Sequence, residues 1–277
     1  MLRLLWALML ASLGVLSAGD QPSPSVQEIM ARVAANQDHG QKARAEYVYQ
    51  QRIHVVSLRT NGKLAREETT DYLVTPTPDG TKKELKHIDG RYWHKGKYVE
   101  FHGEPVPEPD SLDGSLVHDF CVDFTKDQSK DGLGHDLFPV TTEQQKDYRF
   151  ELAGEATVQG RKVYRVSFRP VDKNELTWAG EALIDTEEFE PVRVYTKLSR
   201  RIPFFVRTLL GTDLPGLGFN VEYRRFDEGV WFPMSFGTEF RLRAVFFINR
   251  DITVSLENSA FQRAKVQSKI LDFQPVK

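Results

Sequence analysis

The sequence predicts a mainly β protein with one N-terminal helix and about ten antiparallel strands. Apolar residues at helical spacing follow Ser25, and a two-residue alternation predominates from Tyr47 onward. Turn signals such as Asn61-Gly62 recur between the alternating runs. Strands of this kind reduce their exposed edges by curling into a barrel or a sandwich.

The first 19 residues resemble a secretory signal peptide. A basic start at Arg3 precedes an apolar run over Leu4–Leu16, and small residues follow at Ser17–Gly19. The run is too short to anchor stably in a bilayer core of about 30 Å, although an uncleaved anchor helix is the alternative. We expect cleavage after Gly19, which leaves residues 20–277 as one exported, periplasmic and soluble domain.

Composition excludes several classes of protein. The formal net charge is -2, with 40% hydrophobic and 27% charged residues, so a nucleic-acid partner is not expected. The aromatic and β-branched content is too high for a disordered chain. A single cysteine, Cys121, cannot form an internal disulfide.

A capping box predicts where the helix begins. Ser25 and Glu28 have the required spacing, and we expect the helix to run over Val26–Gln37 and to end near Gly40. The apolar residues at helical spacing are Val26, Ile29, Met30 and Val33. This apolar stripe must pack against another element.

The strands are predicted from alternation and from turns. The Asp89-Gly90 and Lys95-Gly96 pairs are interpreted as turns that separate short strands. In the first half we expect strands over 47–57, 64–75, 83–88, 91–94 and 98–102. In the second half we expect strands over 148–152, 156–159, 162–170, 178–185, 192–198, 218–226, 230–242, 251–256 and 260–270. A short helix over Leu112–Phe124 and a helical turn over Thr141–Asp147 complete the prediction.

Four stretches, taken in order, resemble the LolA-like superfamily, the outer-membrane lipoprotein-sorting proteins and their relatives. The first is the amphipathic helix followed by a long hairpin, and the second is Asp89–Trp93. The third is Gly160–Phe168, which leads through Trp178 to Ile184-Asp185 and Pro191–Arg193, and the fourth is Tyr223–Pro233. The resemblance covers about Ser25 to Phe261.

The resemblance implies an incomplete β-barrel, which is one strongly curved antiparallel sheet. Its concave face is apolar and is capped by the N-terminal helix and by short helices. The resemblance also implies a non-catalytic carrier of acyl chains that needs no cofactor. This chain departs from the lipoprotein carriers in having Thr75 before Pro76, where they usually place an arginine. It also carries additions around 103–147 and 200–217.

An apolar stretch broken by glycine and proline is the candidate lipid-binding segment. Its members, with one residue from a later apolar run, are Phe204, Phe205, Leu209, Leu210, Leu214, Leu217 and Phe246. Apolar loops normally bury or bind, so this segment is either a flap or membrane-touching loop, or a short helix tucked into the barrel opening. Arg200, Arg201 and Arg207 would meet anionic head groups in a transient contact with a membrane surface. Phe246 belongs to a run that could instead be a buried strand end.

The N-terminal helix is the candidate lid, through Ile29, Met30 and Val33. The alternative is that the helix simply plugs the sheet.

No catalytic or metal motif was found. His118, Asp119, Cys121 and Asp123 lie close together but match no zinc spacing, and no nucleophile signature surrounds the cysteine. The first hypothesis is therefore a non-enzymatic carrier or binder of lipid or lipidated protein, which sequesters acyl chains in an apolar cavity. The second is a protein-interaction or envelope-sensing module built on the same half-barrel. The third is a hydrolase using His118 or His135.

Overall fold

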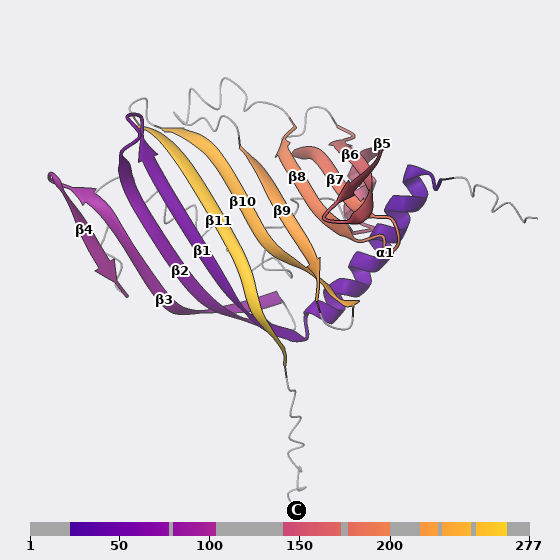
Figure 1. The fold of residues 1–277 in the computed structure, drawn as a ribbon, viewed down its shortest axis with the longest axis horizontal. Coiled ribbons are helices and arrows are strands. Elements are labelled where there is room, and N and C mark those ends of the chain that lie inside the picture. Colours follow the sequence, from indigo (N-terminus) through magenta and orange to yellow (C-terminus); the bar gives the residue numbers. More distant parts are fainter. Residues whose placement is uncertain are drawn as a thin grey trace, which may run out of the picture.

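The structure, a computed structural model, describes residues 23–77, 80–103, 141–172, 177–199, 217–226, 229–244 and 248–264. Within these ranges the chain forms one α-helix, one 3-10 turn and a single sheet of eleven antiparallel strands (Figure 1). The predicted fold class, a mainly β chain with one open antiparallel sheet and an N-terminal helix, is confirmed. Apart from α1, the only helical element in this described part is the 3-10 turn η1.

The bounds of the elements follow the order of the chain. The first half holds α1 (Val26–Arg44), β1 (Tyr47–Arg59), β2 (Leu64–Thr77), β3 (Gly80–His94) and β4 (Lys97–His102). The second half holds η1 (Gln144–Asp147), β5 (Tyr148–Val158), β6 (Arg161–Pro170), β7 (Trp178–Asp185), β8 (Pro191–Leu198), β9 (Gly218–Arg225), β10 (Trp231–Ala244) and β11 (Ile248–Arg263).

The strands lie in the order β4-β3-β2-β1-β11-β10-β9-β8-β7-β6-β5. Strands that are neighbours in the sheet are also consecutive in the chain, with one exception. The exception is the pairing of β1 with β11, the last strand of the described residues. The edge strands β4 and β5 lie at opposite ends of the order, so the sheet does not close into a barrel. The β5–β8 part curls toward α1 (Figure 1).

The two faces of the sheet differ in character, because successive side chains of a strand point to opposite faces. On β1 the buried residues Ile53 and Val55 alternate with Arg52 and His54, which are more exposed. We call the face that carries Ile53 and Val55 the inner face, and the opposite one the outer face. The strand register carries this division across the neighbouring strands, since Ile53 lies opposite Leu256.

The helix begins where the sequence predicts and ends later. Ser25 caps α1 and forms the predicted capping box with Glu28. The expected end near Gly40 is wrong, because α1 continues to Arg44. Gly40 lies inside the last turns, where a Cβ would stand 3.1 Å from the Arg44 guanidinium, so the glycine leaves room for that side chain.

The predicted turn at Asp89-Gly90 is wrong, because β3 runs without a break from Gly80 to His94. Gly90 lies opposite Phe101 in the β3–β4 pairing. A Cβ on Gly90 would stand 2.2 Å from the Phe101 ring and 2.7 Å from the Glu67 carbonyl oxygen. The glycine therefore serves a close contact between strands and not a change of chain direction.

Two further pairs of predicted strands are single strands. β5 passes through Gly154, whose φ of 123° accompanies a shift of register, and so joins the segments predicted before and after it. β11 joins the segments predicted around Asp251 and Ala260, and Ala260 has a φ of 54°. Local irregularities of this kind bend a strand without ending it. The predicted helix at Leu112–Phe124 lies outside the described residues.

Candidate functional site

The apolar inner face of the sheet is the candidate site. Its largest part spans β1, β11, β10 and β9, and we call it the central cluster. Its buried members are Ile53, Val55, Phe219, Val221, Phe236, Phe240, Leu242, Ile252, Val254 and Leu256. The Phe219 ring contacts Trp178 and Phe236, with centroids 4.6 and 4.9 Å apart. The cluster contains no residue of α1.

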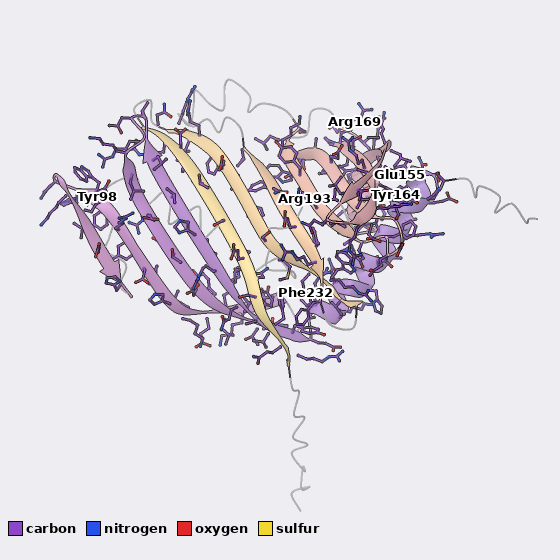
Figure 2. The ribbon with its side chains drawn as sticks, viewed as in Figure 1. Tyr98, Glu155, Tyr164, Arg169, Arg193 and Phe232 are labelled. Carbon is purple, nitrogen blue, oxygen red and sulfur yellow. The ribbon has the colours of Figure 1, made fainter. Side chains whose placement is uncertain are left out.

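The helix packs on a neighbouring part of the inner face, formed by β6, β7 and β8. Ile29, Met30 and Val33, the predicted lid residues, are almost fully buried there. Their strand partners include Tyr164, which Figure 2 places close to α1, and Ile184. This position suits both a lid and a permanent plug, so the lid role stays a prediction.

A polar network fastens the last turns of α1 to the sheet. The buried Arg44 guanidinium donates to the Trp231 carbonyl oxygen at 2.9 Å and to the Gln37 side chain at 3.2 Å. Gln37 in turn donates to the carboxylate of Glu190, the residue directly before β8. Burial raises the pKa of the Glu190 carboxyl to about 7, against the opposing effects of the Arg44 charge and the Gln37 hydrogen bond.

The turn between β7 and β8 makes a second attachment to α1. Asn36 of the helix donates to the carbonyl oxygens of Glu188 and Phe189, at 2.6 and 3.3 Å. Phe189 has a φ of 55°, which is unusual for a residue other than glycine, and Arg32 lies 4.5 Å from its ring centroid. The Glu188 carboxylate also accepts from the Trp231 indole at 2.9 Å.

The β2–β4 side of the inner face is polar as well as aromatic. Arg66 and Glu68 form an ion pair at 2.6 Å with side chains only 2% and 4% exposed. The Arg66 guanidinium lies 5.0 Å from the Phe101 ring centroid. Toward the other end of these strands, Lys83 donates to Gln51 at 2.9 Å. The inner face therefore combines an apolar centre with a polar flank.

The outer face is covered by ion pairs between neighbouring strands. Arg52 pairs with Asp71 at 2.8 Å, and the guanidinium holds the pKa of the Asp71 carboxyl below its usual range. Further pairs join Arg91 to Glu67, Arg165 to Glu181, Arg193 to Glu222 and Arg241 to Asp251. Grooves of about 520 and 480 Å³ lie on this face, the first beside the Arg52–Asp71 pair. The first groove is lined by charged side chains, among them Arg52, Asp71 and Glu257, and such surroundings do not suit an acyl chain.

The predicted lipid-binding residues are only partly described. Leu217 packs against the central cluster and directly precedes β9. The other six, Phe204, Phe205, Leu209, Leu210, Leu214 and Phe246, lie outside the described residues, as do His118, Cys121 and His135. Their proposed role therefore stays a prediction.

Sequence reasoning missed the network around Arg44 and Glu190 and the buried pair on β2. Arg66 and Glu68 share the parity of Thr70, Tyr72 and Val74 along their strand, so alternation alone placed them on the inner face. The sequence signal that could have identified this pair is the presence of charged residues at strand positions that alternation assigns to the inner face.

Two searches within the described ranges gave negative results. No group of three or more His, Cys, Asp or Glu side chains there is placed to hold a metal ion. No helix in the same ranges is long and apolar enough to cross a membrane.

The fold and site define a class of protein: an open antiparallel half-barrel whose apolar inner face carries one helix. No protein-family model matches the chain. No curated protein matches it either.

Solved structures similar to this one include three bacterial proteins. A Vibrio parahaemolyticus domain named for outer-membrane lipoprotein sorting has a TM-score of 0.35 and 12% identity, covering 84% of this chain and 92% of that one. A DUF1329 family protein from Desulfovibrio piger has a TM-score of 0.38 and 10% identity, covering 88% and 95%. A LolA superfamily protein from Nitrosomonas europaea has a TM-score of 0.34 and 10% identity, covering 88% and 95%. The third of them is named for the superfamily that the sequence resembles. At these identities and TM-scores the likeness says nothing of function.

Proposed function

We propose that the protein is a non-catalytic carrier or binder of lipid or lipidated protein, exported to the periplasm, and that it holds acyl chains on its inner face. The observation that carries the proposal is the central cluster, a buried group of apolar side chains that four adjacent strands project onto the inner face. The helix packs on the neighbouring cluster and contributes no residue to the central one. The fold and the site both support this proposal.

The physical driving force is the burial of hydrocarbon. Each methylene group moved from water into an apolar site contributes about 0.8 kcal/mol, so a chain needs no specific polar contact to bind. On the outer face, ion pairs such as Arg165–Glu181 join neighbouring strands. Binding on the inner face also places the ligand beside α1, whose movement would expose or cover it.

The proposal is tested by native mass spectrometry of the protein purified from a periplasmic extract. We expect bound lipid in the wild type and its loss when Phe204, Phe205, Leu209 and Leu210 are replaced with Ser. A matched control replaces the exposed Leu152 and Val171 with Ser, which should leave the lipid load unchanged. A correctly folded fourfold variant that keeps its full lipid load would contradict the role of these residues. A wild type that carries no lipid would contradict the proposed function.

A further inference from the structure

Two hairpin ends lie side by side at one end of the sheet, close to the β4 edge. They are 59–64, which joins β1 to β2, and 93–98, which joins β3 to β4; we call them the basic hairpin ends. The Arg59 guanidinium lies 5.5 Å from the Trp93 ring centroid, and the Tyr98 hydroxyl donates to the Leu64 carbonyl oxygen at 3.4 Å. Figure 2 shows Tyr98 at the far side of the sheet from Tyr164 and α1.

The basic hairpin ends concentrate positive charge in a chain whose net charge is -2. They contain Arg59, Lys63, Lys95 and Lys97, and neither sequence segment contains Asp or Glu. All three lysines are exposed. Elsewhere on the outer face, arginines such as Arg52 are neutralised by a carboxylate on the next strand. The positive charge of the hairpin ends is therefore local and faces solvent.

The same surface displays two aromatic side chains. Trp93 and Tyr98 are 37% and 43% exposed and contact each other edge to face, with centroids 5.0 Å apart. The Arg91 guanidinium lies 5.7 Å from the Tyr98 ring centroid. Tryptophan and tyrosine beside basic residues are typical of protein surfaces that sit at the head-group level of a bilayer.

The turn that presents these side chains has a left-handed backbone conformation. Lys95 and Gly96 have φ values of 45° and 88°, which matches a two-residue turn with both central residues in the left-handed region. Asparagine is the preferred non-glycine residue at the first position of such a turn, and lysine is not. The lysine thus adds charge at a position where backbone geometry favours another residue.

We propose that the basic hairpin ends form a docking surface for a bilayer that contains anionic phospholipid. The lysines and Arg59 would lie near the phosphate groups, and Trp93 and Tyr98 would enter the interfacial layer. Each basic residue close to an anionic membrane contributes about 1 kcal/mol, and the attraction falls off within a Debye length. Figure 1 shows α1 at the opposite side of the sheet from β4, so contact at the hairpin ends would leave α1 away from the membrane.

The test measures partitioning of the full chain onto phosphatidylcholine vesicles with and without 30% phosphatidylglycerol, at low and high salt. We expect binding that requires the anionic lipid and is lost at high salt. Lys95→Asn combined with Lys97→Thr should weaken binding about thirty-fold, since two charges are removed. Lys95→Asn suits the turn, so this variant is expected to fold at least as well as the wild type.

The matched control is Lys82→Gln with Lys86→Gln, which removes the same charge from exposed positions in the first half of β3, away from the hairpin ends. We expect it to bind vesicles nearly as well as the wild type. Trp93 supplies a second readout, because its emission should shift to the blue on docking and Trp93→Phe should lose that shift. Equal binding by both lysine variants, or binding without anionic lipid, would overturn the proposal. Retention of the protein on heparin at the same salt concentration, without binding to vesicles, would also overturn the proposal.

This inference stands apart from the proposed acyl-chain site. Vesicle docking depends on the hairpin ends, whereas co-purified lipid depends on the inner face. Lipid that co-purifies with the protein, together with absent vesicle binding, would overturn the docking surface alone.

Discussion

Glu190 places a carboxyl group where α1 meets the sheet. It accepts a hydrogen bond from Gln37 and lies near the Arg44 charge and the Glu188 carboxylate. Its pKa of about 7, against an ordinary value of 4.5, means that the folded protein binds this proton more tightly than the unfolded chain does.

This pKa predicts how stability depends on pH. A raised carboxyl pKa gives a contribution that is complete below pH 4.5 and is lost as pH rises through about 7. The loss amounts to about 3 kcal/mol at most, from a difference of about 2.5 pKa units. We expect Glu190→Gln to remove this part of the pH dependence, so that the variant gains stability relative to the wild type between pH 5 and pH 8.

Urea unfolding at pH 5, 6, 7 and 8 measures the effect. The control is Glu187→Gln, which changes an exposed carboxylate in the same turn and should keep the wild-type pH profile. Parallel profiles for wild type and Glu190→Gln would contradict the assignment.

At the scale of the element, β2 shows how alternation can bury charge. Arg66 and Glu68 are two residues apart, so both project onto the inner face, where they pair at 2.6 Å. Breaking a buried pair leaves one charge without its partner, whereas replacing both members with apolar residues avoids that cost.

We therefore expect Glu68→Gln to destabilise the protein by about 3 kcal/mol. The double variant Arg66→Met with Glu68→Leu should recover most of that loss. Urea unfolding of the two variants beside the wild type measures both values. A double variant that is less stable than Glu68→Gln would contradict this expectation. The ion pair would then stabilise the protein by more than the cost of removing its two charges from water.

The elements themselves were predicted well from local patterns. The capping box at Ser25, the hairpin at Asn61-Gly62 and the helical turn near Thr141 all have counterparts in the structure. Several errors came at glycines, whereas the predicted break in β11 lies before Ala260. Gly90 and Gly154 resemble turn residues in sequence, but one makes room for Phe101 and the other bends β5 at a bulge.

At the scale of the whole molecule, the β1–β11 pairing holds the sheet together. It joins the N-terminal strands β1–β4 to the strands that come later in the chain. The pairing begins with Tyr47 opposite Arg263 and ends with Arg59 opposite Arg250. Interior strands of a sheet are paired on both sides, whereas β4 and β5 have a partner on one side only.

We expect amide hydrogen exchange to follow this order, with β1, β11 and β10 the most protected and β4 and β5 the least. Exchange detected by NMR or mass spectrometry at several urea concentrations measures it. The amide of Asn61, in the solvent-exposed turn between β1 and β2, serves as the fast-exchanging reference. Exchange of β1 and β11 as fast as that of the edges would contradict a single cooperative sheet.

The candidate site was predictable only in part. The sequence indicated an apolar binding face and named Ile29, Met30 and Val33 as the helix residues that face it, and these three are buried on the inner face. The central cluster collects residues from β1 and from β9–β11, which are more than 150 residues apart. Such pairings depend on the sum of many weak contacts and leave no local pattern in the sequence.

The sequence by itself determined the helix, most strand positions, the mainly β class and the division of each strand into an apolar and a polar face. These follow from periodicity, capping and turn chemistry, which act over a few residues. Only the tertiary structure decided that β1 pairs with β11, that Glu190 meets Arg44 through Gln37, and that the hairpin ends bearing Lys63 and Lys95 lie side by side. The physical reason is that burial, pKa shifts and local charge density depend on which distant segments become neighbours.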